Sequence, residues 1–541
     1  MAKILFINPV IREEDDPKHV PYGIALLAAL ARQHGHQVQV YDANAWRLGD
    51  DALREALEAD AWDVIASGCI TTGYGSLKQI VQMAHEHAPQ AVIVIGGGVL
   101  TSMPHDIMTF LPHVDIGVVG EAFVTFLEIL ERIDRHERDW SQVAGVIYRD
   151  AAGALQLTDI RPLISREALD RLPYPAWELF PLDIYWKNSR LLYSEEAFTS
   201  RRRLDINASY GCSLICRFCF HLGITGDLSY TKGAGGKREV EFTYKREIRW
   251  HSADYIVKMI RHARERFGID FVLFLDENLM TMNSYSHWTW LPELAQAWID
   301  AGLQPSCRRD KRPHDAKCRG VHWGGTSHAT LVKKDLLGVL YDSGCSQLLY
   351  GYESFSDRIL RNLGKGTTAE LNERSLRWTI ESGIRPIPNQ IVGFPDEFFD
   401  SIRDSVRAWE RMGIVVKPFF ATPYPGSEWY YTYKERILEQ YQGDLEAFLL
   451  DLGDATKITA VISENFNAVE LLGLRELMVN RDFKHIDEYE RMWKKAHGEP
   501  FIPDFRRHPR MPAKQLRILQ ATEPPASLAM ATAAVPAEAS G

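Results

Sequence analysis

The sequence has few cysteines, no long apolar run and no excess of positive charge. Its 7 cysteines among 541 residues argue against a disulfide-rich secreted protein, and residues 1–8 are expected to form a strand rather than a signal peptide. No stretch reaches the roughly 18 apolar residues that a membrane-spanning helix needs. A formal net charge of −10 argues against nucleic-acid binding through phosphate neutralisation. We therefore expect a cytoplasmic protein with no transmembrane segment and no nucleic-acid partner.

The N-terminal 150 residues lack a G-x-G-x-x-G fingerprint after their first apolar run, which argues against a nicotinamide cofactor. They alternate short apolar runs with amphipathic segments, and the runs lie at 3–8, 37–42, 63–69, 91–96 and 115–120. Alternation at this spacing predicts a doubly wound parallel sheet, in which ligands bind at the carboxyl ends of the strands.

Small residues gather at three of these predicted strand ends. Such residues let the backbone approach a large flat ligand, although tight turns of any similar fold also use glycine. The candidate ligand-binding residues at these ends are Ser67, Thr71, Thr72, Gly73, Gly96, Gly97, Gly98, Gly120 and Glu121.

Three cysteines, Cys212, Cys216 and Cys219, lie in one short segment, and no fourth cysteine is near. A cubane iron–sulfur cluster has four iron corners that each take a thiolate, so three cysteines leave one iron open to a small molecule. Zinc usually takes four ligands from two spaced pairs, and no second pair lies at the usual offsets. We therefore predict a [4Fe-4S] cluster, with zinc binding or inert thiols as the alternatives.

The spacing of this triplet, with an aromatic residue before its last cysteine, resembles the signature of the radical S-adenosylmethionine (SAM) superfamily. In that family the open iron chelates the amino and carboxylate groups of SAM, and an electron from the cluster then yields a 5′-deoxyadenosyl radical. The resemblance implies a partial (β/α)6 barrel over 201–430, with its active site at the carboxyl ends of the strands. It also implies an electron donor such as flavodoxin or ferredoxin.

Later segments follow the pattern of the same family in the same order. The first would hold the amino group of SAM, the second would face its ribose and methionine parts, and the third would lie along the adenine. Their candidate SAM-binding residues are Asp276, Glu277 and Asn278, then Glu353 and Ser354, then Gly393. For the first group, capping of a helix N-terminus is the alternative role.

The N-terminal domain, residues 1–150, resembles the cobalamin-binding domain that precedes many radical SAM cores. The likeness runs through segment 21–43, the glycines after the fourth strand and the glycine–glutamate pair at 120–121. It implies that cobalamin binds at the small residues of the strand ends. The Asp-x-His-x-x-Gly loop that supplies a lower cobalt ligand in some cobalamin enzymes is absent, so we expect no histidine of this chain beneath the cobalt.

The remaining segments are divided by composition. Residues 151–200 hold several prolines that break regular structure and are expected to form a linker. Residues 431–521 have helical periodicity and predict a small helical C-terminal domain. Residues 522–541 are rich in alanine and proline and are expected to be disordered.

The segment 306–322 fits the family pattern poorly. It carries Cys307 and Cys318 among several basic residues, with His314 and His322 nearby. We interpret it as a solvated basic loop, because its spacings match no common metal template. A zinc or auxiliary cluster site and a contact with an anionic substrate are the alternatives.

Together these resemblances predict a cobalamin-dependent radical SAM enzyme that methylates an unactivated carbon. The deoxyadenosyl radical would remove a hydrogen atom from the substrate, and methylcobalamin would supply the methyl group. A cyclisation, rearrangement or oxidation, as in relatives of the anaerobic magnesium-protoporphyrin cyclase, is the first alternative, and a non-catalytic corrinoid- or cluster-binding regulator is the second. The substrate is expected to be a small molecule, a lipid or a tetrapyrrole.

Overall fold

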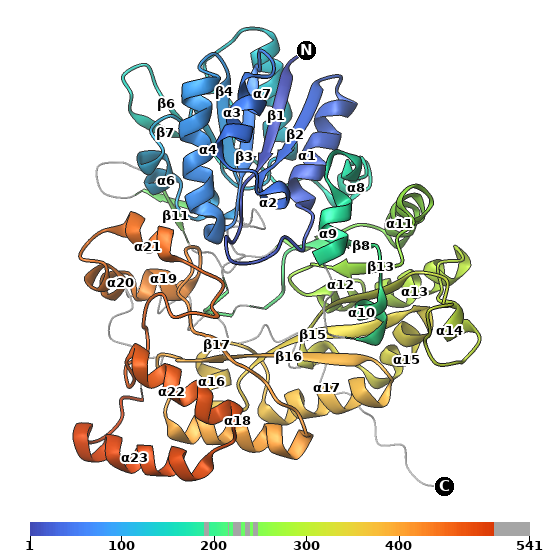
Figure 1. Ribbon diagram of the computed structural model, residues 1–541, viewed down its shortest axis with the longest axis vertical. Coiled ribbons are helices and arrows are strands. Elements are labelled where there is room, and N and C mark those ends of the chain that lie inside the picture. Colours follow the sequence, from blue (N-terminus) through green and yellow to red (C-terminus); the bar gives the residue numbers. More distant parts are fainter. Residues whose placement is uncertain (189–193, 215, 220–228, 233–237, 242–246, 503–541) are drawn as a thin grey trace.

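The computed structural model describes residues 1–188, 194–214, 216–219, 229–232, 238–241 and 247–502. The expected tail at 522–541 lies outside these residues. Figure 1 shows an N-terminal α/β unit, drawn in blue, above a second α/β unit in green to gold, with orange to red helices along one side. The predicted fold class, two successive α/β units with a helical C-terminal part, is confirmed.

The N-terminal unit contains a seven-stranded sheet in the order β2-β1-β3-β4-β5-β6-β7. Its first five strands are parallel, and the last two extend it as an antiparallel hairpin. The strands are β1 Lys3–Asn8, β2 Gln37–Asp42, β3 Val64–Gly68, β4 Val92–Gly96, β5 Ile116–Val118, β6 Val146–Arg149 and β7 Leu155–Leu157. The order of the parallel strands is that of a doubly wound sheet, as predicted from the alternation.

Helices cover both faces of this sheet, which explains why its strands are nearly continuous apolar runs. Alternate residues of β1 pack on opposite faces: Leu5 and Ile7 belong to the core beneath α3 and α4, and Ile4 and Phe6 to the core beneath α1 and α7. The helical segments are α1 Tyr22–Gln33, α2 Ala43–Trp46, α3 Asp50–Glu58, η1 Thr71–Gly73, α4 Tyr74–His87, α5 Gly98–Ser102, α6 Pro104–Phe110 and α7 Phe123–Asp134.

The segment between the two sheets is not a plain linker, because it contains short helices. They are α8 Arg166–Leu169, η2 Trp177–Leu179, α9 Leu182–Asn188 and α10 Glu195–Thr199. Trp177 and Tyr185 from this segment are almost fully buried in the core that also holds the second sheet. The segment therefore packs between the two α/β units.

The second unit is built on six parallel strands in chain order, β8-β13-β14-β15-β16-β17. The strands are β8 Arg203–Ile206, β13 Phe271–Phe274, β14 His322–Ser327, β15 Cys345–Glu353, β16 Arg385–Val392 and β17 Phe419–Phe420. The helical segments between them are α11 Ala253–Phe267, α12 Leu279–Tyr285, α13 Trp290–Asp300, α14 Ser306–Arg309, η4 Ala329–Leu331, α15 Lys334–Ser343, α16 Asp357–Asn362, α17 Ala369–Glu381 and α18 Phe399–Met412. This arrangement confirms the predicted partial (β/α)6 barrel.

Two small antiparallel pairs lie between β8 and α11. One joins β9 Ser209–Tyr210 to β12 Arg249–Trp250, and the other joins β10 Ser229–Lys232 to β11 Arg238–Glu241. The first pair fixes the chain immediately before the cysteine triplet.

The C-terminal helices contact two separate surfaces. Phe448 and Leu449 of α21 belong to a core of the N-terminal unit, whereas Leu474 of α22 and Trp493 of α23 belong to the barrel core. The helices are α19 Glu428–Thr432, α20 Lys434–Gln440, α21 Leu445–Asp451, α22 Ala468–Val479 and α23 Phe483–His497. Among the described residues, no helix has both the length and the apolar character that crossing a membrane requires.

Candidate cofactor site

The three predicted cluster cysteines lie in one loop at the carboxyl edge of the barrel sheet, directly after β9. Cys212 and Cys216 are buried and Cys219 is partly exposed. The loop is anchored in its middle, where the Arg217 N–H donates to the Leu363 carbonyl at 3.1 Å. Three thiols on so short a loop fit a cluster that has one open iron corner.

Asp276, just beyond β13, fastens the start of this loop. Its carboxylate accepts hydrogen bonds from the Ala208 N–H, at 3.1 Å, and from the Ser209 hydroxyl. Burial raises the pKa of Asp276 to about 6, although these hydrogen bonds work to lower it. The Asn278 side chain caps α12, accepting from the Met280 N–H at 3.2 Å. Asn278 therefore has the alternative role of capping a helix N-terminus, and the Asp276 carboxylate has hydrogen-bond donors within the chain.

Glu353 ends β15 with a φ of +60°, a left-handed conformation that is uncommon outside glycine. Its Oε1 lies 2.9 Å from Nζ of Lys365, and both side chains are buried. Burial works to lower the pKa of Lys365, but the Glu353 carboxylate and the thiolates of Cys216 and Cys219 outweigh it and raise that pKa. The Lys365 ammonium, which the sequence analysis missed, therefore acts electrostatically on two of the three cluster cysteines.

The other predicted SAM-binding residues lie at the same edge. Ser354 is buried, with its hydroxyl 3.4 Å from that of Ser405. Gly393 has a φ of +93°, and its N–H donates to Oε2 of Glu397 at 2.9 Å. Gln390 on β16 is 1% exposed, and neither of its amide atoms has a hydrogen-bond partner among the described residues. An orphaned buried amide near the end of a barrel strand indicates a polar ligand.

A cavity of about 610 Å³ lies between the carboxyl ends of the N-terminal sheet and the barrel. The predicted cobalamin-binding residues that line it are Ser67, Gly96, Gly97, Gly98, Gly120 and Glu121. The barrel residues that line it are Asn207, Tyr210, Leu275 and Glu277. The remaining candidates, Thr71, Thr72 and Gly73, form η1 and do not line the cavity. Tyr210 and Glu277 adjoin the cysteine loop and Asp276 in sequence, so the cavity reaches the edge of the predicted cluster region, although none of the three cysteines lines it.

Chain packing itself requires two of the glycines at these strand ends. At Gly97, whose φ is +90°, an added Cβ would lie 2.6 Å from the carbonyl oxygen of Cys69. At Gly68 it would lie 2.7 Å from the carbonyl oxygen of Gly96. Tight turns therefore account for these two glycines, which add no side chain of their own to the cavity wall.

Two polar contacts between side chains hold the two units together beside the cavity. Oε1 of Glu121 lies 2.7 Å from Nη2 of Arg249 in β12, and Oε2 accepts from the Ile164 N–H at 2.9 Å. Nδ1 of His19 lies 2.9 Å from Oδ2 of Asp205 in β8. Glu121 therefore has a joining role besides its place in the lining.

His19 is a cavity-lining histidine, and its side chain is about half exposed. One of its ring nitrogens faces Asp205 across the interface between the two units. The expectation that no histidine of this chain ligates cobalt from below stays a prediction.

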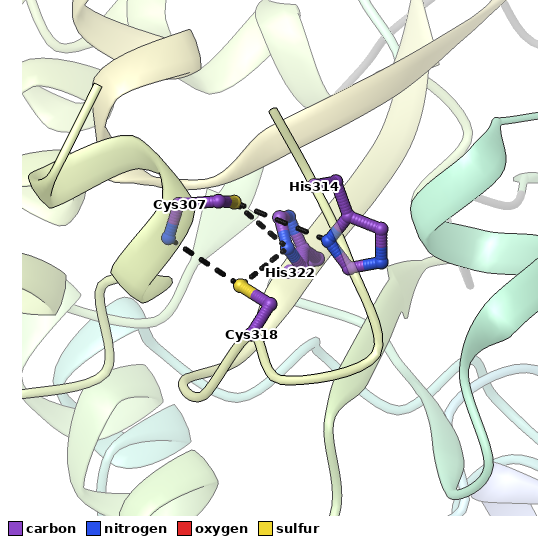
Figure 2. A group of neighbouring side chains, drawn as sticks. All are labelled: Cys307, His314, Cys318 and His322. Carbon is purple, nitrogen blue, oxygen red and sulfur yellow. Dashed lines mark hydrogen bonds between the residues drawn. The ribbon is translucent and has the colours of Figure 1, made fainter. Parts of the chain in front are cut away.

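The segment 306–322 is more than a solvated loop. Cys307, Arg308 and His322 are buried, and the two cysteines and two histidines of the segment lie together (Figure 2). The interpretation as a solvated basic loop is therefore wrong for these residues.

Comparison with known proteins agrees with this geometry. Residues 9–130 match the B12 binding domain family, and residues 206–408 match the radical SAM superfamily. The chain therefore has a B12 binding domain followed by a radical SAM domain. The two matched segments supply the two walls of the cavity, glycine strand ends from the first and Asn207, Tyr210 and Glu277 from the second.

Three relatives illustrate the likeness. An uncharacterised methyltransferase of Pyrococcus horikoshii is 24% identical over 81% of this chain and 84% of its own length. The anaerobic magnesium-protoporphyrin IX monomethyl ester cyclase of Rubrivivax gelatinosus is 23% identical over 75% of this chain and 65% of its own. The structure of the radical SAM methyltransferase TsrM from Kitasatospora setae, with cobalamin and a [4Fe-4S] cluster bound, has a TM-score of 0.59 at 17% identity and covers 81% of this chain and 79% of that one. The chain therefore shares the fold of TsrM.

Proposed function

We propose that this protein methylates an unactivated carbon of a small-molecule, lipid or tetrapyrrole substrate. The observation that carries the proposal is a cavity lined by strand ends of both α/β units. When bound, the cluster with SAM would supply a hydrogen-abstracting radical, and cobalamin would supply the methyl group. Reduction of the cluster would require a one-electron donor such as flavodoxin or ferredoxin.

The chain's own residues would bind and orient these groups. Cys212, Cys216 and Cys219 would hold the cluster, with the Lys365 ammonium acting on two of these thiolates. The unpaired amide of Gln390 would take polar atoms of SAM. In the same proposal Glu277, Glu353, Ser354 and Gly393 face SAM, and the glycine strand ends lie against the corrin ring.

A cyclisation, rearrangement or oxidation with the same cofactors is the second candidate. The 23% identity to the magnesium-protoporphyrin cyclase over three quarters of this chain favours it. The two candidates differ in the fate of SAM, because methylation uses a methyl group from SAM and cyclisation uses only its adenosyl part. A non-catalytic regulator would consume no SAM.

Anaerobic protein reconstituted with iron, sulfide and cobalamin tests the proposal without knowledge of the substrate. With SAM and a strong reductant it should form 5′-deoxyadenosine, and also S-adenosylhomocysteine in an amount set by the cobalamin content. Cys216→Ala should abolish 5′-deoxyadenosine, whereas Cys345→Ala, which changes a buried thiol of β15, should not. Formation of 5′-deoxyadenosine without S-adenosylhomocysteine at every cobalamin loading would contradict methylation and favour the second candidate.

A further inference from the structure

Four side chains that the proposed function does not use form a compact cluster at the other end of the barrel sheet. Cys307 lies in α14, His314 and Cys318 lie in the loop after it, and His322 begins β14. One ligand atom from each lies within 4.8 Å of all the others. Figure 2 shows the two sulfur atoms and the two imidazole rings gathered around one point. We propose that this set, called here the Cys2His2 cluster, binds a structural zinc ion.

The distances within the Cys2His2 cluster are close to those of ligands around a single ion. Sγ of Cys307 lies 4.0 Å from Nδ1 of His314 and 3.7 Å from Nε2 of His322. Sγ of Cys318 lies 3.7 Å from the same Nε2. Tetrahedral zinc, with Zn–S bonds of about 2.3 Å and Zn–N bonds of about 2.0 Å, places neighbouring ligand atoms about 3.3–3.8 Å apart.

A bound ion accounts for this arrangement better than packing or hydrogen bonding alone. Nε2 of His322 faces both sulfur atoms at the same distance, whereas a ring nitrogen forms one directed hydrogen bond along its lone pair or its N–H. An ion placed between the three atoms satisfies all of them at once. Cys307 and His322 are 1% and 4% exposed, so water does not solvate these ligand atoms from outside.

Further contacts hold the ligands in position. The second ring nitrogen of His314, Nε2, lies 2.9 Å from the hydroxyl of Thr199 in α10, which leaves Nδ1 to face the cluster. The Cys307 N–H points to Sγ of Cys318 at 3.4 Å, as backbone amides commonly do toward metal-bound thiolates. Such outer contacts orient the ligands of metal sites.

The loop that carries the ligands is closed at its base. The Ser306 N–H donates to the Arg319 carbonyl at 2.6 Å, and the Arg319 N–H donates to the Ser306 hydroxyl at 3.0 Å. The buried guanidinium of Arg308 bonds Glu196 of α10 and the hydroxyl of Tyr341 in α15, both at 2.7 Å. The site is therefore built into the barrel and is not a chance meeting of surface side chains.

Its place in the barrel favours a structural ion over a catalytic one. The cluster lies at the amino end of β14, whereas the cysteine loop and the cavity lie beyond the carboxyl ends of the strands. The six residues of β14 are joined by steps of about 3.3 Å, so the first and the last lie about 17 Å apart. Four protein ligands leave no open position for water or substrate. The ion would fasten the 306–322 loop to the sheet.

Metal analysis of the holoenzyme, produced in zinc-supplemented medium, tests the proposal. We expect about one zinc per chain beside the cluster iron, and a zinc-edge X-ray absorption spectrum with two sulfur neighbours at about 2.3 Å and two nitrogen neighbours at about 2.0 Å. The double substitution Cys307→Ser with Cys318→Ser should lower the zinc content at least tenfold without lowering cluster iron. Cys345→Ala, which removes another buried thiol from the same sheet, should keep its zinc.

His314→Ala keeps the test decisive if the double variant does not fold. His314 is partly exposed, so its loss should leave the fold intact and weaken zinc binding at least tenfold in competition with a chelator. Wild-type protein without zinc, full zinc retention in the double variant, or unchanged affinity in His314→Ala would overturn the proposal. Iron with a mixed sulfur and nitrogen shell at this site would overturn the identity of the metal.

Discussion

The buried pair of Lys365 and Glu353 allows a quantitative prediction at the cluster site. Replacing Lys365 with methionine keeps most of the side-chain volume but leaves the Glu353 carboxylate, 8% exposed, without its cation and near the cluster thiolates. Removing one partner of a buried ion pair costs about 3–5 kcal/mol. We expect Lys365→Met to lower the free energy of unfolding of the barrel by this amount.

Anaerobic differential scanning calorimetry measures this effect. For a unit of about 150–250 residues, 1 kcal/mol corresponds to a Tm shift of about 2–4 °C, so the barrel transition should fall by about 6–20 °C. Glu353→Gln, which removes the unpaired charge, should restore much of the loss when combined with Lys365→Met. Iron content should fall in Lys365→Met and recover only partly in the double variant, because the cation beside Cys216 and Cys219 is still missing.

Two results would refute this reasoning. A Tm for Lys365→Met within about 2 °C of wild type would mean that the buried carboxylate does not need its cation. A double variant no more stable than Lys365→Met alone would mean that the loss arises from packing and not from the uncompensated charge.

Three further predictions concern the cavity and the edge of the barrel. Gly97→Ala should destabilise the N-terminal unit and lower cobalamin loading, because its Cβ would meet the Cys69 carbonyl at 2.6 Å. Gly338→Ala, where nothing lies within 4 Å of the added atom, should change neither the stability nor the loading. Equal cobalamin loading of both variants would contradict the prediction. His19→Ala should retain cobalamin, and the electron paramagnetic resonance (EPR) spectrum of its cob(II)alamin should match that of wild type, with no splitting from a histidine nitrogen of the chain. A nitrogen splitting that is present in wild type and lost in the variant would show that His19 ligates cobalt. Burial raises the pKa of Asp276 from 3.8 to about 6, so the folded state binds more protons than the unfolded chain and the free energy of unfolding should fall as pH rises through this window. Asp276→Asn should remove up to about 3 kcal/mol of that fall in thermal melts between pH 4 and pH 7. Parallel stability profiles for the two proteins would contradict this.

Local patterns in the sequence were sufficient to predict the architecture. Apolar runs separated by amphipathic segments predicted the N-terminal parallel sheet, because strands covered by helices on both faces are apolar throughout. The barrel was predicted from the family resemblance. The triplet of Cys212, Cys216 and Cys219 predicted the cluster loop, since its function depends on spacing along the chain. Gly97 and Gly393 have positive φ angles, which favour glycine, while their contacts with the cofactors stay predictions.

Contacts between distant segments could not be predicted in the same way. The partner of Glu353 is Lys365, which reaches it only through the fold, and Glu121 meets Arg249 across the two units. A metal site at the Cys2His2 cluster was only an alternative to a solvated basic loop, because its last ligand begins a strand and its geometry depends on the sheet rather than on a local spacing. The C-terminal helices were predicted as one domain because helical periodicity does not tell which surface each helix contacts.

We expect cobalamin in the cavity to lie close to the SAM-binding cluster, because Tyr210 and Glu277 of the cavity wall adjoin the cysteine loop and Asp276 in sequence. EPR spectroscopy of the reduced holoenzyme, with cob(II)alamin and a one-electron-reduced cluster present together, tests it most directly. We expect magnetic interaction between the two centres, seen as broadening and faster relaxation of the cob(II)alamin signal, and we expect it to disappear in Cys216→Ala. Two independent signals, with cob(II)alamin relaxation unchanged by loss of the cluster, would contradict it.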